Sequence, residues 1–195
     1  MTPLEQYPEG VAPICPIPYS PAFSELMSFF RAVFHSREIT MRAYNLTEDV
    51  IRNNAGNYSA WHYRRLLIDE LKIDKETEMK FLNLLAEDLE KNYQIWHHRR
   101  CVIEKFQNFE QEKEFLEDMF ISDSKNYHAW SYRIWLIERF NLYDGELAFT
   151  DSLLDSNVTN NSIWSYRYFI TAKTTTFTHD VIKSEVNLLI TKRLP

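Results

Sequence analysis

The chain has 195 residues, of which 45% are hydrophobic, 15% aromatic and 26% charged, and its formal net charge is −6. This composition is typical of a globular protein, and the negative charge excludes a general electrostatic attraction to nucleic acid. Cys15 and Cys101 are the only cysteines, too few for a disulfide framework or a cysteine-based zinc site. With no signal-peptide pattern and no apolar run of membrane-spanning length, we expect a reducing, cytoplasmic compartment.

The distribution of proline predicts where helices begin. Six of the seven prolines lie between Pro3 and Pro21, and residues 22–194 contain none. Because proline interrupts helices, we predict an extended Pro-rich tail over 1–20 and one helical-repeat domain over 21–195, whose first helix covers about 21–36. Only three glycines occur, which argues against Gly-rich phosphate loops and a turn-dense β protein. Thr47, Asp74 and Asp144, each followed by acidic residues, are predicted helix N-caps.

Four segments share the pattern Asn-x-x-x-Trp-x-x-Arg. They cover residues 57–64, 92–99, 126–133 and 160–167, and their asparagines are 35, 34 and 34 residues apart. A period in the thirties is typical of stacked helical pairs. We therefore predict an all-α fold, an α–α superhelix in the form of a right-handed solenoid of antiparallel helical hairpins with repeats of about 34 residues.

The tryptophan and arginine of each motif are predicted to be structural. These residues are Trp61 and Arg64, Trp96 and Arg99, Trp130 and Arg133, and Trp164 and Arg167. A large Trp at a fixed position should fill the gap between helix pairs. The arginine lies on the same helical face, and once buried it must pair with a carboxylate or with backbone groups. The asparagine before each helix is predicted to cap it.

The residues beside each asparagine vary and are predicted to lie in turns, where binding residues concentrate. They are Tyr58-Ser59, Tyr93-Gln94, Tyr127-His128 and Asn161-Ser162, and lysine precedes the asparagine in the second and third copies, as Lys91 and Lys125. Lys, Tyr, Gln and His at helix N-termini would suit an anion and a polar ligand. From this pattern alone, binding and structural roles remain about equally open. No metal site is predicted, because His97 and His98 are adjacent and point about 100° apart on a helix.

The sequence resembles the α subunit shared by protein farnesyltransferase and geranylgeranyltransferase type I, over almost its whole length. KNYQIWHHRR (91–100) and KNYHAW (125–130) are the most specific matches, and NNSIWSYRYFI (160–170), Pro-Ile-Pro-Tyr (16–19) and Phe-Phe-Arg-Ala-Val (29–33) also fit. The resemblance implies a heterodimer whose β subunit carries zinc and forms most of the lipid pocket. Magnesium is a further metal that such an enzyme can use. That enzyme transfers an isoprenoid from its diphosphate to the cysteine of a C-terminal CaaX motif, and its α subunit is inactive alone.

The resemblance also implies roles for single residues. Lys91 matches a lysine that contacts the diphosphate, and Gln94 matches a glutamine that contacts the carboxylate end of the CaaX peptide. Tyr93, Tyr127 and His128 match positions lining the mouth of the diphosphate and lipid site, and Tyr58 is a less specific match.

One departure from the family pattern concerns the repeat number. Family members continue through further repeats, and a fifth asparagine would fall near residue 194. We therefore expect a shortened member or an incomplete sequence, with an unpaired last helix over about 177–194. Two alternatives remain open: a non-catalytic helical-repeat scaffold that binds peptides or proteins, and the α subunit of a Rab-type geranylgeranyltransferase.

Overall fold

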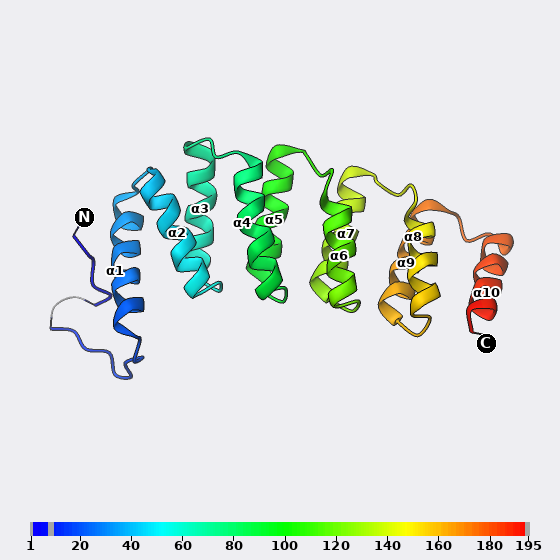
Figure 1. Cartoon of the computed structure of the whole chain (residues 1–195), viewed down its shortest axis with the longest axis horizontal. Coiled ribbons are helices and arrows are strands. Elements are labelled where there is room, and N and C mark those ends of the chain that lie inside the picture. The colour runs from blue at the N-terminus through cyan, green and yellow to red at the C-terminus, as the bar shows by residue number, and fades with distance from the viewer. Residues whose placement is uncertain (1, 8–9, 194–195) are drawn as a thin grey trace. The chain divides into compact units, whose positions relative to one another are not determined.

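The computed structural model describes residues 2–7 and 10–193, and the regular elements within them are all helices (Figure 1). They are α1 (Pro21–Ser36), α2 (Met41–Asn53), α3 (Tyr58–Glu70), α4 (Lys75–Asp88), α5 (Tyr93–Phe106), α6 (Glu112–Ser122), α7 (Tyr127–Phe140), α8 (Glu146–Ser156), α9 (Asn161–Thr174) and α10 (His179–Arg193). The prediction of an all-α helical-repeat fold is confirmed. Three residues of the predicted tail (1, 8 and 9) and the expected helix end at 194 lie outside the described residues.

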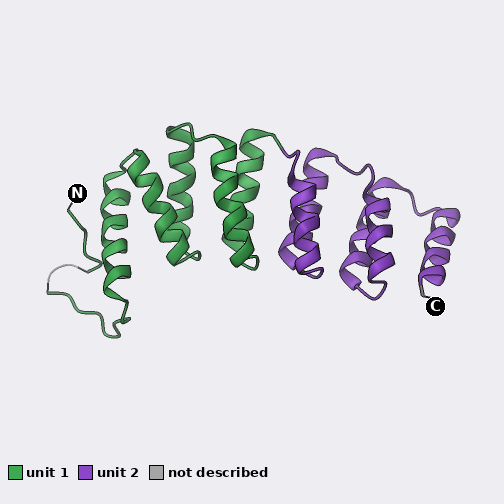
Figure 2. Ribbon diagram, viewed as in Figure 1, with its two compact units in different colours: residues 1–108 green, residues 109–195 purple. Residues whose placement is uncertain are grey.

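The helices fall into two compact units, residues 1–108 with α1 to α5 and residues 109–195 with α6 to α10 (Figure 2). Apart from α1 and α10, the helices form pairs in which an even-numbered helix turns back into the next odd-numbered helix. In the first unit α2 packs on α3 and α4 on α5, and in the second unit α6 packs on α7 and α8 on α9. Successive odd-numbered helices also touch, α3 with α5 and α7 with α9. Each unit therefore contains two antiparallel hairpins, with the motif helix as the second member of each, and one further helix, α1 or α10.

A four-residue turn that ends in the motif asparagine joins the two helices of each hairpin, and we call it the capped turn. The capped turns are residues 54–57, 89–92, 123–126 and 157–160. In each, the asparagine is the N-cap, and its side-chain oxygen accepts a hydrogen bond from a backbone N–H two or three residues later. This satisfies one or two of the four N–H groups that a helix start leaves unpaired. The predicted capping role of the asparagines is confirmed.

Two of the three predicted caps outside the motif are wrong. Asp74 does cap α4, accepting from the backbone N–H of Thr77 at 2.8 Å. Thr47, in contrast, lies inside α2, where its hydroxyl donates to the carbonyl oxygen of Tyr44 at 2.7 Å. A threonine can bond backward in this way within a helix, so its presence does not define a helix start. Asp144 is also not a cap, because the left-handed Gly145 directly precedes α8.

Each motif tryptophan is tied to its own capped turn. Its indole Nε1 donates to the backbone carbonyl six residues earlier, the carbonyl two positions before the asparagine. The pairs are Trp61 with Ala55 (2.8 Å), Trp96 with Glu90 (2.6 Å), Trp130 with Ser124 (3.0 Å) and Trp164 with Val158 (2.7 Å). The first three tryptophans are buried, as predicted, but the expectation that all four are core is wrong, because Trp164 is only half-buried.

Buried carboxylates hold consecutive hairpins together. In the first unit, Nε and Nη2 of Arg64 contact the two carboxylate oxygens of Glu78 in α4 at 2.7 and 2.9 Å. The same carboxylate accepts from the hydroxyl of Tyr44 at 2.6 Å and bonds Nε2 of His98 at 2.8 Å. The guanidinium also lies 4.0 Å from the ring centre of Phe81, which adds a cation–π contact. One glutamate thus connects α2, α3, α4 and α5.

The second unit repeats the arrangement. Arg133 of α7 contacts both oxygens of Glu146 in α8 at 2.8 and 3.0 Å, and the hydroxyl of Tyr166 in α9 donates to Glu146 at 2.5 Å. Arg167 contacts Glu185 in α10 at 2.6 and 2.9 Å. The prediction that a motif arginine pairs with a carboxylate is thereby confirmed for Arg64, Arg133 and Arg167, whereas Arg99 donates to the side-chain oxygen of Asn83 at 2.7 Å.

Charge balance decides the ionisation of Glu78. Burial opposes its ionised form, but hydrogen bonding to His98 and the charge of Arg64 outweigh that cost and lower the pKa of Glu78 to about 2. The chief effect on His98 is burial, which lowers its pKa, so the imidazole is neutral at pH 7. Glu78 therefore stays charged at the centre of the first unit.

We predict that Glu78 makes the protein sensitive to acid. Because the folded-state pKa lies below the ordinary 4.5, the stabilisation is fully present above about pH 4.5 and is lost as the pH falls toward 2. Glu78→Gln should cost roughly 3–5 kcal/mol at pH 7, since it leaves the Arg64 charge buried without its partner. Urea unfolding from pH 7 down to pH 2 should show the gap between wild type and variant closing. The exposed neighbour change Glu76→Gln should cost less than about 1 kcal/mol, and a gap that stays constant with pH would contradict the role of Glu78.

We also predict unequal costs for removing two motif tryptophans. Trp96→Ala should lower the free energy of unfolding by about 3–5 kcal/mol, because the side chain is buried and its indole holds the capped turn. Trp164→Ala should cost clearly less, since part of that ring is already in solvent. Urea unfolding of the two variants provides the comparison, and equal losses would show that exposure at Trp164 does not reduce its contribution.

Candidate functional site

The residues predicted to contact substrates lie at the N-termini of motif helices. In the first unit, Lys91 precedes the capping asparagine of α5, and Tyr93 and Gln94 are the first two residues of that helix. Tyr58 is the first residue of α3, whose N-terminus lies at the capped-turn end of its hairpin, as the N-terminus of α5 does (Figure 1). The structure thus brings Lys91, Tyr93 and Gln94 into one turn of chain.

In the second unit, Tyr127 and His128 occupy the corresponding first two positions of α7. Their rings meet edge to face with centroids 5.5 Å apart. His128 is half-buried, whereas Tyr127 is exposed.

Hydrogen bonds on both sides fix the backbone around Lys91. On one side, the carbonyl of Glu90 accepts from the indole of Trp96 at 2.6 Å. On the other, the backbone N–H of Asn92 donates to the carbonyl of Leu89 at 2.9 Å, and its side chain caps α5 through the N–H groups of Gln94 and Ile95. Lys91 therefore occupies a backbone position that core residues determine, while its own side chain is 74% exposed.

The same position exists in every capped turn, and its residue differs from copy to copy. It holds Gly56, Lys91, Lys125 and Thr159 in chain order. Because the surrounding hydrogen bonds recur in all four copies, the fold does not require a lysine there. A lysine at this position is therefore not needed for folding, which is the physical basis for treating Lys91 as a candidate site residue.

The electrostatics at the start of α5 favour an anion. The ammonium of Lys91 lies 3.7 Å from a carboxylate oxygen of Glu90. An exposed pair of this kind contributes less than about 1 kcal/mol, so an incoming anion can replace the glutamate. The N-terminus of a helix adds partial positive charge and backbone N–H groups directed at the same region. Lys91 and the start of α5 together can therefore bind a negatively charged group.

Three large aromatic residues project from equivalent positions. Tyr58, Tyr93 and Tyr127 are 72%, 69% and 70% exposed, whereas the fourth copy has Asn161 there. Tyrosine is frequent in protein interfaces, because it offers a large apolar ring and a hydroxyl that can bond a partner. These tyrosines therefore make the N-terminal ends of α3, α5 and α7 candidate contact positions.

The described part of the chain contains no group of three or more His, Cys, Asp or Glu side chains placed to hold a metal ion. The imidazole of His98 is hydrogen-bonded to the carboxylate of Glu78, and Nε2 of His97 lies 3.7 Å from the sulfur of Cys101.

The same described residues include no helix with the length and hydrophobicity that crossing a bilayer requires.

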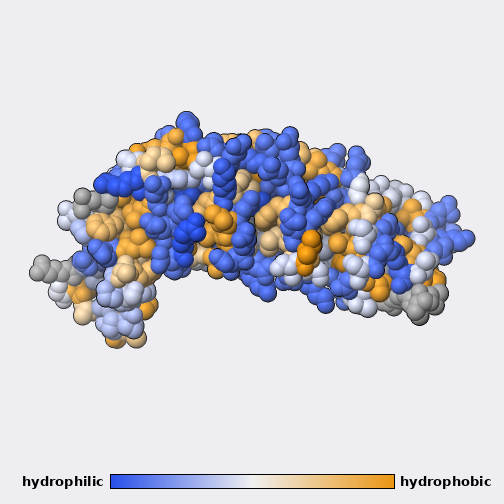
Figure 3. Space-filling view, viewed as in Figure 1, coloured by the Kyte–Doolittle hydropathy of each residue, from blue (hydrophilic) through white to orange (hydrophobic). Residues whose placement is uncertain are grey.

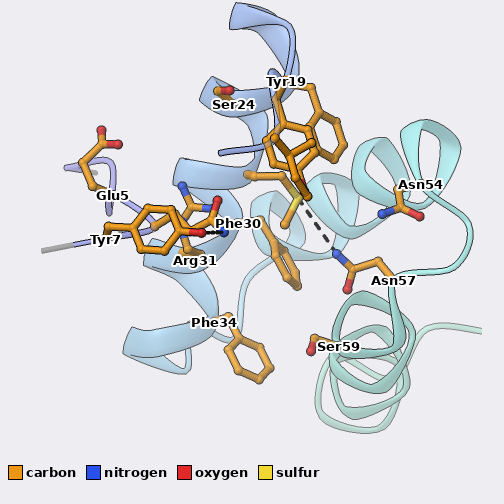
Figure 4. Close-up of a pocket in the computed structure, with 14 residues that line it drawn as sticks. Glu5, Tyr7, Tyr19, Ser24, Phe30, Arg31, Phe34, Asn54, Asn57 and Ser59 are labelled. Carbon is orange, nitrogen blue, oxygen red and sulfur yellow. Dashed lines mark hydrogen bonds between the residues drawn. The ribbon is translucent and has the colours of Figure 1, made fainter. Parts of the chain in front are cut away.

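A cavity of about 650 Å³ lies between the N-terminal segment and α1 in the first unit (Figure 4). The segment is held there by Arg31, whose Nε donates to the carbonyl of Leu4 at 2.8 Å. The lining includes Asn57 and Ser59, on either side of Tyr58, but none of the predicted substrate contacts. This cavity is therefore distinct from the turn that carries Lys91.

The sequence interpretation missed the residues that build the structural framework of this site. It did not identify the buried glutamates Glu78, Glu112 and Glu146, although they too follow one another at intervals of 34 residues. It also missed the histidine or tyrosine directly before the second, third and fourth motif arginines, namely His98, Tyr132 and Tyr166, which bond these carboxylates. The signal was present in the repeat, because an acid that recurs with the repeat period among variable surface acids has a fixed partner.

Capped helical hairpins joined by buried arginine–glutamate pairs define a helical-repeat protein. The chain matches the family described as "Protein prenyltransferase alpha subunit repeat" at residues 41–71, 75–106, 109–140 and 143–174. Each matched segment is one hairpin, from α2–α3 to α8–α9. Together the segments cover more than half of the chain, and the chain belongs to this family.

Several named relatives are similar to the chain. The protein farnesyltransferase/geranylgeranyltransferase type-1 subunit alpha of Pisum sativum is 46% identical over 86 residues, which are 44% of this chain and 26% of the relative. The protein of the same name in Schizosaccharomyces pombe is 38% identical over 112 residues, 57% of this chain and 38% of the relative. A chain from the structure of Candida albicans protein geranylgeranyltransferase-I complexed with GGPP matches with a TM-score of 0.86 and 34% identity, over 95% of this chain and 65% of that one. In each comparison the chain spans less than two thirds of its relative.

We predict that neighbouring residues of the second capped turn differ sharply in their effect on stability. Lys91→Ala should change the free energy of unfolding by no more than about 0.5 kcal/mol, since its side chain is exposed. Asn92→Ala should cost about 1 kcal/mol, because two backbone N–H groups of α5 lose their acceptor. Urea unfolding of both variants tests this. A larger loss of unfolding free energy in the Lys91→Ala variant would show that the Lys91 side chain has a structural role.

Proposed function

We propose that this chain is the α subunit of a heterodimeric CaaX protein prenyltransferase, of the farnesyltransferase and geranylgeranyltransferase type I class. The complete enzyme transfers a farnesyl or geranylgeranyl group from its diphosphate to the thiol of the CaaX cysteine, and the α subunit is inactive alone. The observation that carries the proposal is Lys91, an exposed lysine on a turn whose backbone is fixed by core residues. Family membership and the likeness to the Candida albicans enzyme support it.

Lys91 is assigned to the diphosphate. During transfer, the bond between the isoprenoid C1 carbon and the diphosphate oxygen breaks as the cysteine sulfur bonds to that carbon. Negative charge grows on the departing diphosphate, and an ammonium held nearby stabilises it. Because the turn at 89–92 is already ordered by hydrogen bonds, little reorganisation is needed to place the ammonium. Loss of one such electrostatic donor typically costs on the order of 10²-fold in rate.

Gln94 is assigned to the peptide substrate. It is the second residue of α5 and half-buried, and its side-chain amide can donate to the terminal carboxylate of the CaaX peptide. Tyr93, Tyr127 and His128 are assigned to the mouth of the diphosphate and lipid site. Tyr58 is assigned to the same surface as a peripheral contact.

Zinc, with magnesium where it is used, is assigned to the partner β subunit. The chain has only two cysteines, Cys15 and Cys101, and its described residues do not supply a ligand set. Zinc lowers the pKa of a bound thiol, so that the cysteine reacts as the thiolate. The role of this chain is then to position diphosphate and peptide, and we place the heterodimer in the cytoplasm.

The test is co-expression of the chain with a farnesyltransferase β subunit or a geranylgeranyltransferase type I β subunit. Prenyl transfer to a CaaX peptide, with zinc present, should require both chains. Lys91→Ala should lower kcat about 10²-fold, because the charge it meets develops in the transition state. Gln94→Ala should chiefly raise the KM for the peptide. The matched control is Lys80→Ala on the exposed side of α4, which should leave both constants unchanged.

Other outcomes would correct specific parts of the proposal. An active heterodimer with an unimpaired Lys91→Ala variant would remove that residue from the reaction. Activity only with a Rab-type β subunit would move the chain to the Rab enzyme. Failure to bind any prenyltransferase β subunit would favour a peptide-binding scaffold that uses the exposed tyrosines.

A further inference from the structure

The cavity of about 650 Å³ in the first unit has an apolar wall formed by one face of α1. Phe23, Met27 and Phe30 follow one another at steps of four and three residues, so their side chains share a helical face. Phe30 is buried, and Phe23 and Met27 are half-buried. The volume lies within the range of roughly 300–1,000 Å³ that is usual for sites of small organic ligands. The wall can therefore accept an apolar group of a ligand.

The hydrophobic surface around this cavity is local. In the space-filling view, hydrophobic residues reach the surface in separate patches among hydrophilic ones, including at the end of the molecule where α1 lies (Figure 3). The lining of the cavity also combines apolar residues with charged and amide side chains. Such a mixture is typical of a ligand site, in which a few polar groups fix the orientation of an apolar body.

Arg31 supplies a positive charge that the chain leaves without a carboxylate partner. Its Nε donates to the carbonyl of Leu4 at 2.8 Å, and within the described residues its guanidinium forms no ion pair. Glu5 also lines the cavity, but its carboxylate points away from Phe30 in Figure 4. Nη1 and Nη2 of the half-buried Arg31 thus remain available. Two such N–H groups side by side match the two oxygens of a carboxylate.

The opposite side of the cavity carries an amide with a poor partner. The side-chain oxygen of Asn57 caps α3 by accepting from the N–H of Ala60 at 3.1 Å, whereas its Nδ2 donates to the sulfur of Met27 at 3.9 Å. A thioether is a weak acceptor, so a carbonyl oxygen would be a better partner for this Nδ2. Figure 4 shows Arg31 on one side of Phe30 and Asn57 on the other.

The same face of α1 already binds one piece of extended backbone. The N–H of Leu4 donates to the carbonyl of Ser28 at 3.0 Å, and the carbonyl of Leu4 accepts from Arg31. These two bonds hold the N-terminal segment against the helix beside the cavity. Because they use only Nε of Arg31, they fix its guanidinium without consuming the end that faces a ligand. The charge is therefore positioned before any ligand arrives.

We propose that this cavity binds an N-acylated apolar amino acid through its free carboxylate. The carboxylate pairs with Nη1 and Nη2 of Arg31, and the acyl carbonyl accepts from Nδ2 of Asn57. The apolar side chain lies between them, against Phe23, Met27 and Phe30. A fatty acid would lack the acyl carbonyl beside the carboxylate, and an internal peptide segment would lack the carboxylate.

The ligand chemistry is the same in a free N-acylated amino acid and in the last residue of a peptide, and the experiment below distinguishes these sources. The cavity is lined by neither Lys91 nor Gln94. The proposal therefore does not depend on the prenyltransferase assignment.

The test is a titration of the full chain, labelled with ¹³C at its methionine methyl groups, with N-acetylphenylalanine and with its uncharged amide. N-acetylphenylalanine should shift the Met27 methyl resonance to saturation, while the resonance of Met119 in the second unit stays in place as the internal control. The amide should bind at least about tenfold more weakly, because it cannot form the charged contact with Arg31. In an Arg31→Gln chain, the affinities of the two probes should agree within about twofold.

A matched pair of substitutions on α1 locates the binding. Ser24 lines the cavity and its neighbour Glu25 does not, and both are exposed. Ser24→Trp should fill the space and weaken N-acetylphenylalanine binding at least about tenfold, whereas Glu25→Trp should leave the affinity unchanged. Because both side chains are exposed, both variants should fold.

The source of the ligand follows from a third probe, acetyl-Gly-Gly-Phe with a free carboxylate. Binding as tight as that of N-acetylphenylalanine assigns the site to peptide ends, and clearly weaker binding assigns it to free N-acylated amino acids. A Met27 resonance that neither acid shifts would overturn the proposal. Equal affinity for N-acetylphenylalanine and its amide, or an unimpaired Ser24→Trp chain, would overturn it as well.

Discussion

The buried contact between a motif arginine and the glutamate of the next hairpin is the interaction on which each unit depends. Removing a charge from water costs free energy unless an oppositely charged partner is well placed. Here directional contacts fix both the guanidinium and the carboxylate. The guanidinium of Arg64 meets both oxygens of Glu78, lies over an aromatic ring and also bonds Thr47. Apolar packing alone would allow hairpins to slide along one another, whereas these directional bonds define one register. Arg133 and Glu146 do the same in the second unit.

The capped turns fix the backbone at one end of each hairpin, and with it the positions of the side chains exposed there. The indole of each motif tryptophan reaches from the core to a carbonyl of the turn, so core packing and turn geometry are coupled. The asparagine then fixes where the helix begins. What remains variable is the residue before the asparagine and the first two residues of the helix. Structural positions and variable positions thus alternate within a few residues of chain, so that Asn92 caps α5 while the adjacent Lys91 is the residue that we propose for the diphosphate.

Much of this could be predicted from the sequence because it repeats. Four copies of one pattern identified the helices, the caps and the arginine partners as a class. The acid that each arginine meets was missed because Glu78, Glu112 and Glu146 lie in helices with several other acids, although their spacing of 34 residues distinguishes them. The error at Thr47 arose because a threonine can bond backward within a helix as readily as it can begin one. The assignment of Lys91 and Gln94 came from resemblance, and their positions in the structure follow from the turn that precedes α5.

The position before each capping asparagine also bears on how such proteins diversify. Core residues determine its backbone, and natural copies within this one chain already hold glycine, lysine and threonine there. Even Gly56 does not adopt a left-handed conformation, and a Cβ at that position would meet only the side-chain oxygen of Asn54, at 3.3 Å. Selection can therefore exchange the charge presented by one repeat without a compensating change elsewhere. A protein of this architecture can acquire or lose a ligand contact by a single substitution, with its folding left almost untouched.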